Sequence, residues 1–287
     1  MNVAGPLYSS FIVNCVVNAF SAYTTIMLNL LTIHAMRKTS SLPNPLKTLL
    51  LSLAVSDLGV GLLVQPLYIS LMIDPASSTV IAFTIISLLF GNASFFSVVA
   101  LSVDRFLAIH LHLRYEELVT RKRVVTAVII FWGLCVSFPF IFMASSKELA
   151  NVLIITITGF CFIITAVVYC RIYFIVKHHS NQIQVQVQVA QNSQMESVAR
   201  KRKSAVSTFY VYLVFLVCCL PEYCITVALL ISPPGTALSG LLFYSTTLVF
   251  LNSSLNPVIY GWKMRHIRHA MIDVLRNLFP KQNTSNS

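Results

Sequence analysis

Charged residues are scarce in this sequence and absent from long parts of it. Asp, Glu, Lys and Arg make up 10% of the 287 residues, whereas hydrophobic residues make up 56%. The stretches without any charge are residues 1–36, 75–103, 124–146, 149–170, 204–221 and 223–262, and residues 48–73 carry only Asp57. A helix that crosses a bilayer needs about 20 mostly apolar residues. The missing charge therefore argues against a soluble domain and predicts a membrane protein.

The last charge-free stretch is too long for a single helix. It contains the run Ser232-Pro233-Pro234-Gly235, which cannot continue a helix and so predicts a turn between two spans. Glu222 lies within the first of these two spans, which runs on from the preceding stretch. We therefore predict an all-α membrane protein, a bundle of seven transmembrane helices. The expected spans are residues 8–36, 44–72, 78–109, 122–144, 150–178, 197–231 and 238–261.

Basic residues are missing from one side of the expected membrane. All of the 20 lysines and arginines except Lys147 fall in loops, helix flanks or the tail on the other side. Positive residues near span ends stay cytoplasmic. The pattern therefore predicts a multi-pass plasma-membrane protein with an extracellular N-terminus and a cytoplasmic C-terminus. The formal charge of +11 then faces the lipid bilayer's cytoplasmic surface, and no nucleic-acid partner is expected because no soluble basic domain is present.

Signs of a disulfide framework and of catalysis are missing too. The seven cysteines all lie within expected spans, and none lies in an expected extracellular loop. No Ser/His/Asp, metal-ligand or phosphate-loop arrangement stands out, so we do not expect an enzyme. Internal symmetry of the kind that many transporters show is also missing.

What the sequence does contain is one motif in each expected span. The motifs are Asn29, Leu53-Ala54-Val55-Ser56-Asp57, Asp104-Arg105-Phe106, Trp132, Tyr169, Phe215 with Cys218-Cys219-Leu220-Pro221, and Asn256-Pro257-Val258-Ile259-Tyr260. In this order and at these depths they resemble a rhodopsin-like (class A) G-protein-coupled receptor over nearly the whole chain. Residues 1–262 would form the receptor bundle. Residues 263–287 would form an amphipathic eighth helix, whose apolar residues recur at helical spacing, and a short cytoplasmic tail.

The resemblance implies a switch that couples a ligand to a heterotrimeric G protein. Arg105 would pair with Asp104 at rest and contact the Gα subunit when the sixth span swings outward about the kink at Pro221. The residues assigned to coupling and switching are Asp104, Arg105, Tyr169, Lys201, Phe215, Cys219, Pro221, Asn256, Pro257 and Tyr260. Lys201 stands where many members have an acidic residue that bonds to this arginine. Like charges cannot latch the resting state there, so we expect appreciable basal activity.

Asp57 would be costly to bury as an unpaired charge within a span. The resemblance implies an allosteric sodium ion held by oxygen-bearing side chains, and no other cofactor. The positions are Asp57, Ser94, Asn252, Ser253 and Asn256. The alternative is a protonated Asp57 whose hydrogen bonds only fix helix packing.

Departures from the family pattern leave the ligand open. Val80 replaces the usual cysteine at the outer end of the third span, which is similar to the melanocortin receptors, and the run Leu113-Arg114-Tyr115 is similar to both melanocortin and adenosine receptors. Their ligand-contacting residues do not carry over, because Leu67, Val80 and Thr84 replace melanocortin acidic positions and Thr226 replaces the adenosine-type asparagine. We expect an extracellular small-molecule or peptide ligand. The expected pocket residues are Tyr68, Phe83, Ser87, Leu88, Glu222, Tyr223 and Thr246.

Glu222 is the most informative of these pocket positions. No Lys, Arg or His occupies the outer half of any expected span. Glu222 is therefore either a counter-ion for a cationic group on the ligand, or neutral and hydrogen-bonded to Tyr68, Ser87 or Asn92. Two alternatives to a coupling receptor stay open: a receptor that binds without coupling, and a seven-helix channel or transporter. The intact Asp104-Arg105 pair disfavours the first, and the lack of further charge at mid-span disfavours the second.

Overall fold

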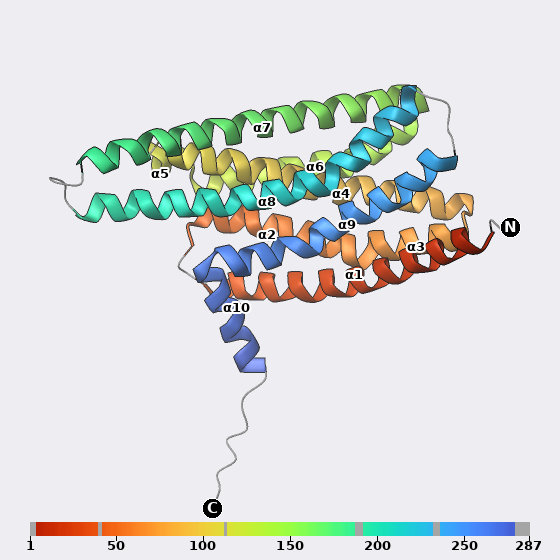
Figure 1. The fold of residues 1–287 in the computed structure, drawn as a ribbon, viewed down its shortest axis with the longest axis horizontal. Coiled ribbons are helices and arrows are strands. Elements are labelled where there is room, and N and C mark those ends of the chain that lie inside the picture. The colour runs from red at the N-terminus through yellow and green to blue at the C-terminus, as the bar shows by residue number, and fades with distance from the viewer. Residues whose placement is uncertain (1–3, 40–41, 112–113, 187–191, 232–235, 279–287) are drawn as a thin grey trace, which may run out of the picture.

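The computed structural model describes residues 4–39, 42–111, 114–186, 192–231 and 236–278, and long helices account for most of them. These helices lie side by side along one direction, and a shorter helix turns away at one end (Figure 1). The elements are α1 (Ala4–Lys38), α2 (Asn44–Gly59), the π-helical turn η1 (Val60–Val64), α3 (Gln65–Ile73), α4 (Ser77–His110), α5 (Tyr115–Leu118), α6 (Arg121–Ala144), α7 (Lys147–Gln186), α8 (Asn192–Ile231), α9 (Thr236–Lys263) and α10 (Arg265–Leu278).

The expected all-α bundle is confirmed, with α2, η1 and α3 forming one continuous rod. Within the part of the chain that the structure describes, six helical segments, this rod among them, are long and apolar enough to cross a membrane. The remaining long helix is α9, which has 28 residues and buries the polar side chains of Asn252, Ser253 and Asn256. Both α7 and α8 extend beyond the expected spans, to Gln186 and from Asn192. The expected turn at 232–235 lies outside the described residues.

Apolar side chains cover the outside of the bundle and polar side chains are buried within it. On α1, Phe20 and Tyr23 are exposed whereas Asn18, Thr25 and Asn29 are buried. A soluble protein shows the reverse arrangement. Since lipid offers no hydrogen bonds, polar groups in a bilayer must find partners inside the protein. The distribution thus fits the membrane environment that the charge-free stretches predict.

The centre of the bundle is α4, which packs against α2, α6, α7 and α8. Glycine permits the closest contact between α2 and α4, because a Cβ atom at Gly59 would lie 2.2 Å from the ring of Phe90. Gly61 does the same in η1, where a Cβ atom would lie 3.2 Å from the carbonyl oxygen of Ala22 in α1. These two glycines hold the second helical rod between α1 and α4.

The two ends of the bundle differ in charge. We call the end at which α1 stops at Arg37 and Lys38, and at which α9 stops at Lys263, the basic end. At this end α10 packs its buried residues Ile267, Met271 and Val274 toward α1 and α9, while its arginines are exposed. This one-sided helix is the one expected after the last span.

Candidate functional site

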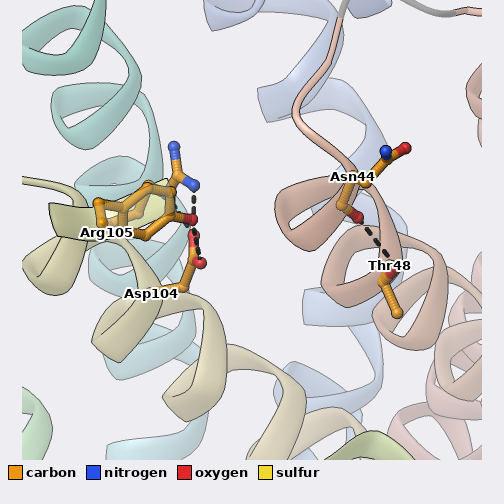
Figure 2. A network of polar contacts seen from close by, with 5 residues as sticks. Asn44, Thr48, Asp104 and Arg105 are labelled. Atoms are coloured by element: carbon orange, nitrogen blue, oxygen red, sulfur yellow. Dashed lines mark hydrogen bonds and ion pairs between the residues drawn. The ribbon is translucent and has the colours of Figure 1, made fainter. Parts of the chain in front are cut away.

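A buried ion pair lies near the end of α4 at the basic end of the bundle. The Arg105 guanidinium is paired with the Asp104 carboxylate, and Nε of Arg105 donates a hydrogen bond to Oδ2 of Asp104 (2.9 Å). Figure 2 shows the two side chains pointing toward each other on the last turns of the helix. Both residues are buried. The two residues that the sequence assigned to a resting pair are therefore in contact.

Tyr115 is a third member of this cluster that the sequence reasoning did not assign a role. Its hydroxyl donates a hydrogen bond to Oδ1 of Asp104 (2.6 Å), from the short helix α5 that follows α4. Burial, and then the nearby Asp104 carboxylate, raise the pKa of the Tyr115 hydroxyl above its usual value, so it stays a donor at neutral pH. Both oxygens of Asp104 are thus occupied, one by Arg105 and one by Tyr115.

Aromatic residues of the predicted switch line the core directly beneath the ion pair. The hydroxyls of Tyr169 and Ser102 are hydrogen-bonded at 3.0 Å, and the Tyr169 ring stacks on Tyr212 of α8 at 4.5 Å between centroids. Tyr260 of α9 belongs to the same buried cluster. Its hydroxyl is buried without a hydrogen-bond partner among the residues that the structure describes. Such a group is costly to bury, so this part of the core has a polar atom that another arrangement could satisfy.

The remaining switch positions lie along α8 and α9. Phe215 packs between Phe95 and Phe162, at 5.3 and 5.9 Å between ring centroids. Pro221 lies inside α8 and Pro257 inside α9. Cys219 packs against the core cluster and lines a cavity above it. The side chain of Lys201 lies outside the described part of the chain, so its expected repulsion of Arg105 stays a prediction.

Asp57 is at the centre of a polar cluster in the middle of the bundle. Its Oδ1 accepts a hydrogen bond from Ser94 of α4 (2.9 Å), and its Oδ2 accepts one from Nδ2 of Asn256 in α9 (2.8 Å). Asn29 of α1 donates to the backbone carbonyl of Ser253 (3.0 Å). The cluster therefore joins α1, α2, α4 and α9 at one level.

The chemistry of this cluster fits a small hard cation. The side-chain oxygens of Asn29, Asn252 and Asn256 are buried without a hydrogen-bond partner among the described residues. Ser94, Asn252 and Ser253 also line the large cavity. A carboxylate beside unpartnered amide oxygens and nearby hydroxyl groups is a donor set that hard cations prefer. All five positions predicted to hold sodium are thus near one another, either bonded to Asp57 or lining the adjacent cavity.

A cavity of about 600 Å³ extends from this level toward the end opposite the basic end. All seven predicted pocket residues line it: Tyr68, Phe83, Ser87, Leu88, Glu222, Tyr223 and Thr246. The sequence reasoning did not assign Phe243 and Phe250 to it. They lie three residues before and four residues after Thr246 on α9, so they share its face, and that spacing is the signal that could have found them.

Glu222 has a hydrogen-bond partner other than those expected. Oγ1 of Thr246 donates to its Oε1 (3.0 Å), which joins α8 to α9 just past Pro221. Of the expected partners, the Tyr68 hydroxyl donates instead to the carbonyl of Phe243 (2.9 Å), and Ser87 to its own helix. The expected bonds from Tyr68 and Ser87 to Glu222 are therefore not formed, because each hydroxyl donates its proton to a backbone carbonyl.

Two further polar contacts tie the helices together. Nε1 of Trp132 in α6 donates to Oγ of Ser52 in α2 (3.0 Å), which explains the tryptophan of the fourth span. On α1, Nδ2 of Asn18 donates to Oδ1 of Asn14 (2.7 Å) and to Thr247 of α9 (3.0 Å). A polar stripe at helical spacing on α1 was the signal for the second contact, and the sequence reasoning did not use it.

Comparison with known proteins gives a consistent assignment. Residues 28–260 match the family model described as 7 transmembrane receptor (rhodopsin family). The chain is similar to adenosine receptor A3 of Ovis aries, with 27% identity over 270 residues that cover 86% of this chain and 84% of the relative. It is similar to adenosine receptor A3 of Canis lupus familiaris at 27% identity over 281 residues, covering 86% of each chain. Adenosine receptor A2a of Canis lupus familiaris is 24% identical over 290 residues, covering 89% of this chain and 70% of the relative.

Proposed function

The chain belongs to the rhodopsin family of seven-transmembrane receptors, and from this premise we propose that it is a ligand-controlled activator of a heterotrimeric G protein. The family consists of membrane receptors that are not enzymes. A ligand would bind in the cavity. The G protein would bind at the basic end, where the receptor would promote its exchange of nucleotide. The contacts of α8 with both the cavity and the core beneath it are the observation that carries this proposal.

The distribution of charge supports an orientation for the receptor. The basic end would face the cytoplasm, since arginine and lysine near helix ends stay on that side. The cavity would then open toward the extracellular side, and the exposed arginines of α10 would lie beside anionic lipid headgroups. Ligand and G protein would thus reach opposite ends of the same helices.

The Asp104–Arg105 ion pair of α4 supports the view that this structure is the resting state of the receptor. Arg105 is 5% exposed and its guanidinium is held by Asp104, so it offers little surface to a partner protein. To contact Gα, the arginine must leave the Asp104 carboxylate, which is also held by Tyr115 of α5. Activation therefore requires the basic end to rearrange at α4 and α5.

Helix α8 supplies the physical link between the two ends. Phe215, Cys219 and Glu222 all line the cavity from α8, and Pro221 removes a backbone hydrogen bond in the same turn. Closer to the basic end of the same helix, Tyr212 stacks on Tyr169 beneath the ion pair. A ligand that shifts α8 near Pro221 would strain these aromatic contacts, and the part of α8 toward the basic end would move most.

Ligand-free signalling in cells tests this proposal. Full-length receptor would be compared with Arg105→Ala at matched surface expression, using sensors for each main Gα class. We expect a basal signal through at least one Gα class in the wild type and its loss in the variant. The control is Arg276→Ala, which removes an exposed arginine of α10 and should keep the signal. An unchanged signal in Arg105→Ala would contradict the role assigned to Arg105, and no signal from any form would favour a receptor that binds without coupling.

A further inference from the structure

The charge inside the cavity points to a ligand class. Building on the receptor function proposed above, we propose that the cavity binds a small organic cation and that the Glu222 carboxylate is its counter-ion. Among the described residues that line the cavity, Glu222 is the only Asp, Glu, Lys, Arg or His. A carboxylate within a membrane bundle requires a positive partner or loses its charge, and the cavity's own residues supply no such partner.

The carboxyl group is placed to receive a partner from the cavity. Its Oε1 accepts one hydrogen bond from Thr246 (3.0 Å), and the residue remains partly accessible inside the cavity. Thr246 Oγ1 also lies 2.9 Å from the carbonyl of Leu242 in its own helix. Its single hydroxyl proton is therefore shared between two acceptors. A ligand ammonium group would give the carboxylate the stronger, charge-assisted hydrogen bond that the threonine cannot supply.

An aromatic wall stands beside this carboxylate. Phe243 and Phe250 lie on the Thr246 face of α9 and pack on the Tyr68 ring, at 6.5 and 5.2 Å between centroids. Phe83 of α4 completes the group at 5.6 Å from Tyr68. Aromatic faces attract cations, most strongly where water is excluded. An acidic group next to aromatic rings in an otherwise uncharged cavity therefore favours an amine or quaternary ammonium head over a neutral or anionic one.

The size and position of the cavity complete the proposal. Its volume of about 600 Å³ falls within the range of about 300–1,000 Å³ that small-molecule sites occupy. Glu222 follows Pro221 directly, so a cation bound to it would act on α8 at the kink and compete with Thr246 for the carboxylate. Glu222 would thus both select a cationic ligand and pass the effect of its binding to α8.

A thiol in the same cavity allows a direct test of the charge. Cys219 lines the cavity three residues before Glu222, which places the two side chains on the same helix face. The purified full-length receptor would be treated with three methanethiosulfonate reagents. One carries a trimethylammonium group, one a sulfonate group and one only a methyl group. Mass spectrometry would give each rate at Cys219. The thiolate fraction affects all three reagents alike, so the ratio of the cationic to the anionic rate reports the local potential.

We expect the cationic reagent to react at Cys219 faster than the anionic one, and Glu222→Gln to lower that ratio at least about tenfold, given a unit charge at about 6 Å. Glu222→Asp, which keeps the charge, should retain most of the preference. Asp74→Asn, which removes an exposed acid at the same end, should leave the ratio unchanged.

Equal ratios in the wild type and in Glu222→Gln would overturn the proposal, since Glu222 would then carry no charge that a ligand could use. Failure of all three reagents to reach Cys219 would overturn it as well, because the cavity would not admit a solute. The labelling needs no G protein. A charged cavity in a receptor that does not couple would therefore leave this inference standing while the proposed function fails, and an uncharged cavity in a coupling receptor would do the reverse.

Discussion

Loss of the Tyr115 hydroxyl should raise the basal activity of this receptor. In the structure that hydroxyl donates to Asp104 at 2.6 Å, while the other oxygen of Asp104 accepts from Arg105. Tyr115→Phe removes only the hydroxyl and keeps the buried ring. Asp104 then loses one of its two contacts, and the carboxylate holds Arg105 in a less constrained position. The resting state, in which the arginine is paired, is weakened more than any state in which the pair is broken.

The size of this effect follows from burial. Asp104 and Tyr115 are 3% and 6% exposed, so solvent does not replace the lost hydrogen bond. Hydrogen bonds to a charged group contribute about 1.5–3 kcal/mol. If the bond is made only at rest, its loss shifts the equilibrium between resting and active forms by about tenfold or more. A receptor with roughly 1% of its population active would then have on the order of 10% active, well above the resolution of a cellular assay.

The assay is ligand-free G-protein activation at matched surface expression, with Tyr23→Phe as the control. Tyr23 is exposed on α1, so the same chemical change there should leave the signal unaltered. A basal signal in Tyr115→Phe equal to that of the wild type, with the variant at the surface, would refute the view that this contact holds the resting state. A lower signal would indicate that Tyr115 supports the active form instead.

Three further substitutions follow from the structure and the sequence. Gly59→Ala should lower the free energy of unfolding by about 1–3 kcal/mol, because the added methyl group would lie 2.2 Å from the Phe90 ring. Gly133→Ala, at a position with nothing within 4 Å, should leave it unchanged. Equal melting temperatures for the two variants would contradict the packing described at Gly59. Replacing potassium by sodium should lower basal signalling in the wild type but not in Asp57→Asn, whereas Asp273→Asn on α10 should respond as the wild type does. A sodium response that persists in Asp57→Asn would show that the ion acts elsewhere. Lys201→Glu should lower basal signalling by restoring an acidic partner for Arg105, and an unchanged signal would rule out that latch.

Much of the fold could be predicted because the membrane simplifies the problem. A charge-free stretch long enough to cross a bilayer has little choice but to be a helix, since lipid satisfies no backbone hydrogen bonds. The π-helical turn at Val60–Val64 could not be predicted in this way. Gly59, just before this turn, lies against Phe90 of α4, and Gly61 within it lies against Ala22 of α1; the rod's own sequence does not determine these contacts.

In the candidate site, too, some residues could be predicted from the sequence and others only from the fold. Motif residues such as Asp57, Arg105 and Glu222 stood out because charge is rare inside a span. Some of their partners, such as Asp104, Ser94 and Asn256, came from the family resemblance. Others did not stand out, since threonine and tyrosine are common in helices. The contact of Tyr115 with Asp104, and that of the expected pocket residue Thr246 with Glu222, became evident only when the fold placed each pair within hydrogen-bond distance. The expected bonds from Tyr68 and Ser87 to Glu222 are not formed, because both hydroxyls donate to backbone carbonyls instead.

The central claim is that this chain promotes nucleotide exchange on a Gα subunit through Arg105. The most direct measurement is the rate at which purified Gα–Gβγ heterotrimers take up a non-hydrolysable GTP analogue beside full-length receptor in lipid nanodiscs. Wild type and Arg105→Ala would be compared at equal receptor concentration. The account predicts that wild type accelerates uptake by at least one class of Gα and that Arg105→Ala does not. Equal acceleration by both forms would contradict the assigned role of Arg105, and acceleration by neither would contradict the coupling function itself.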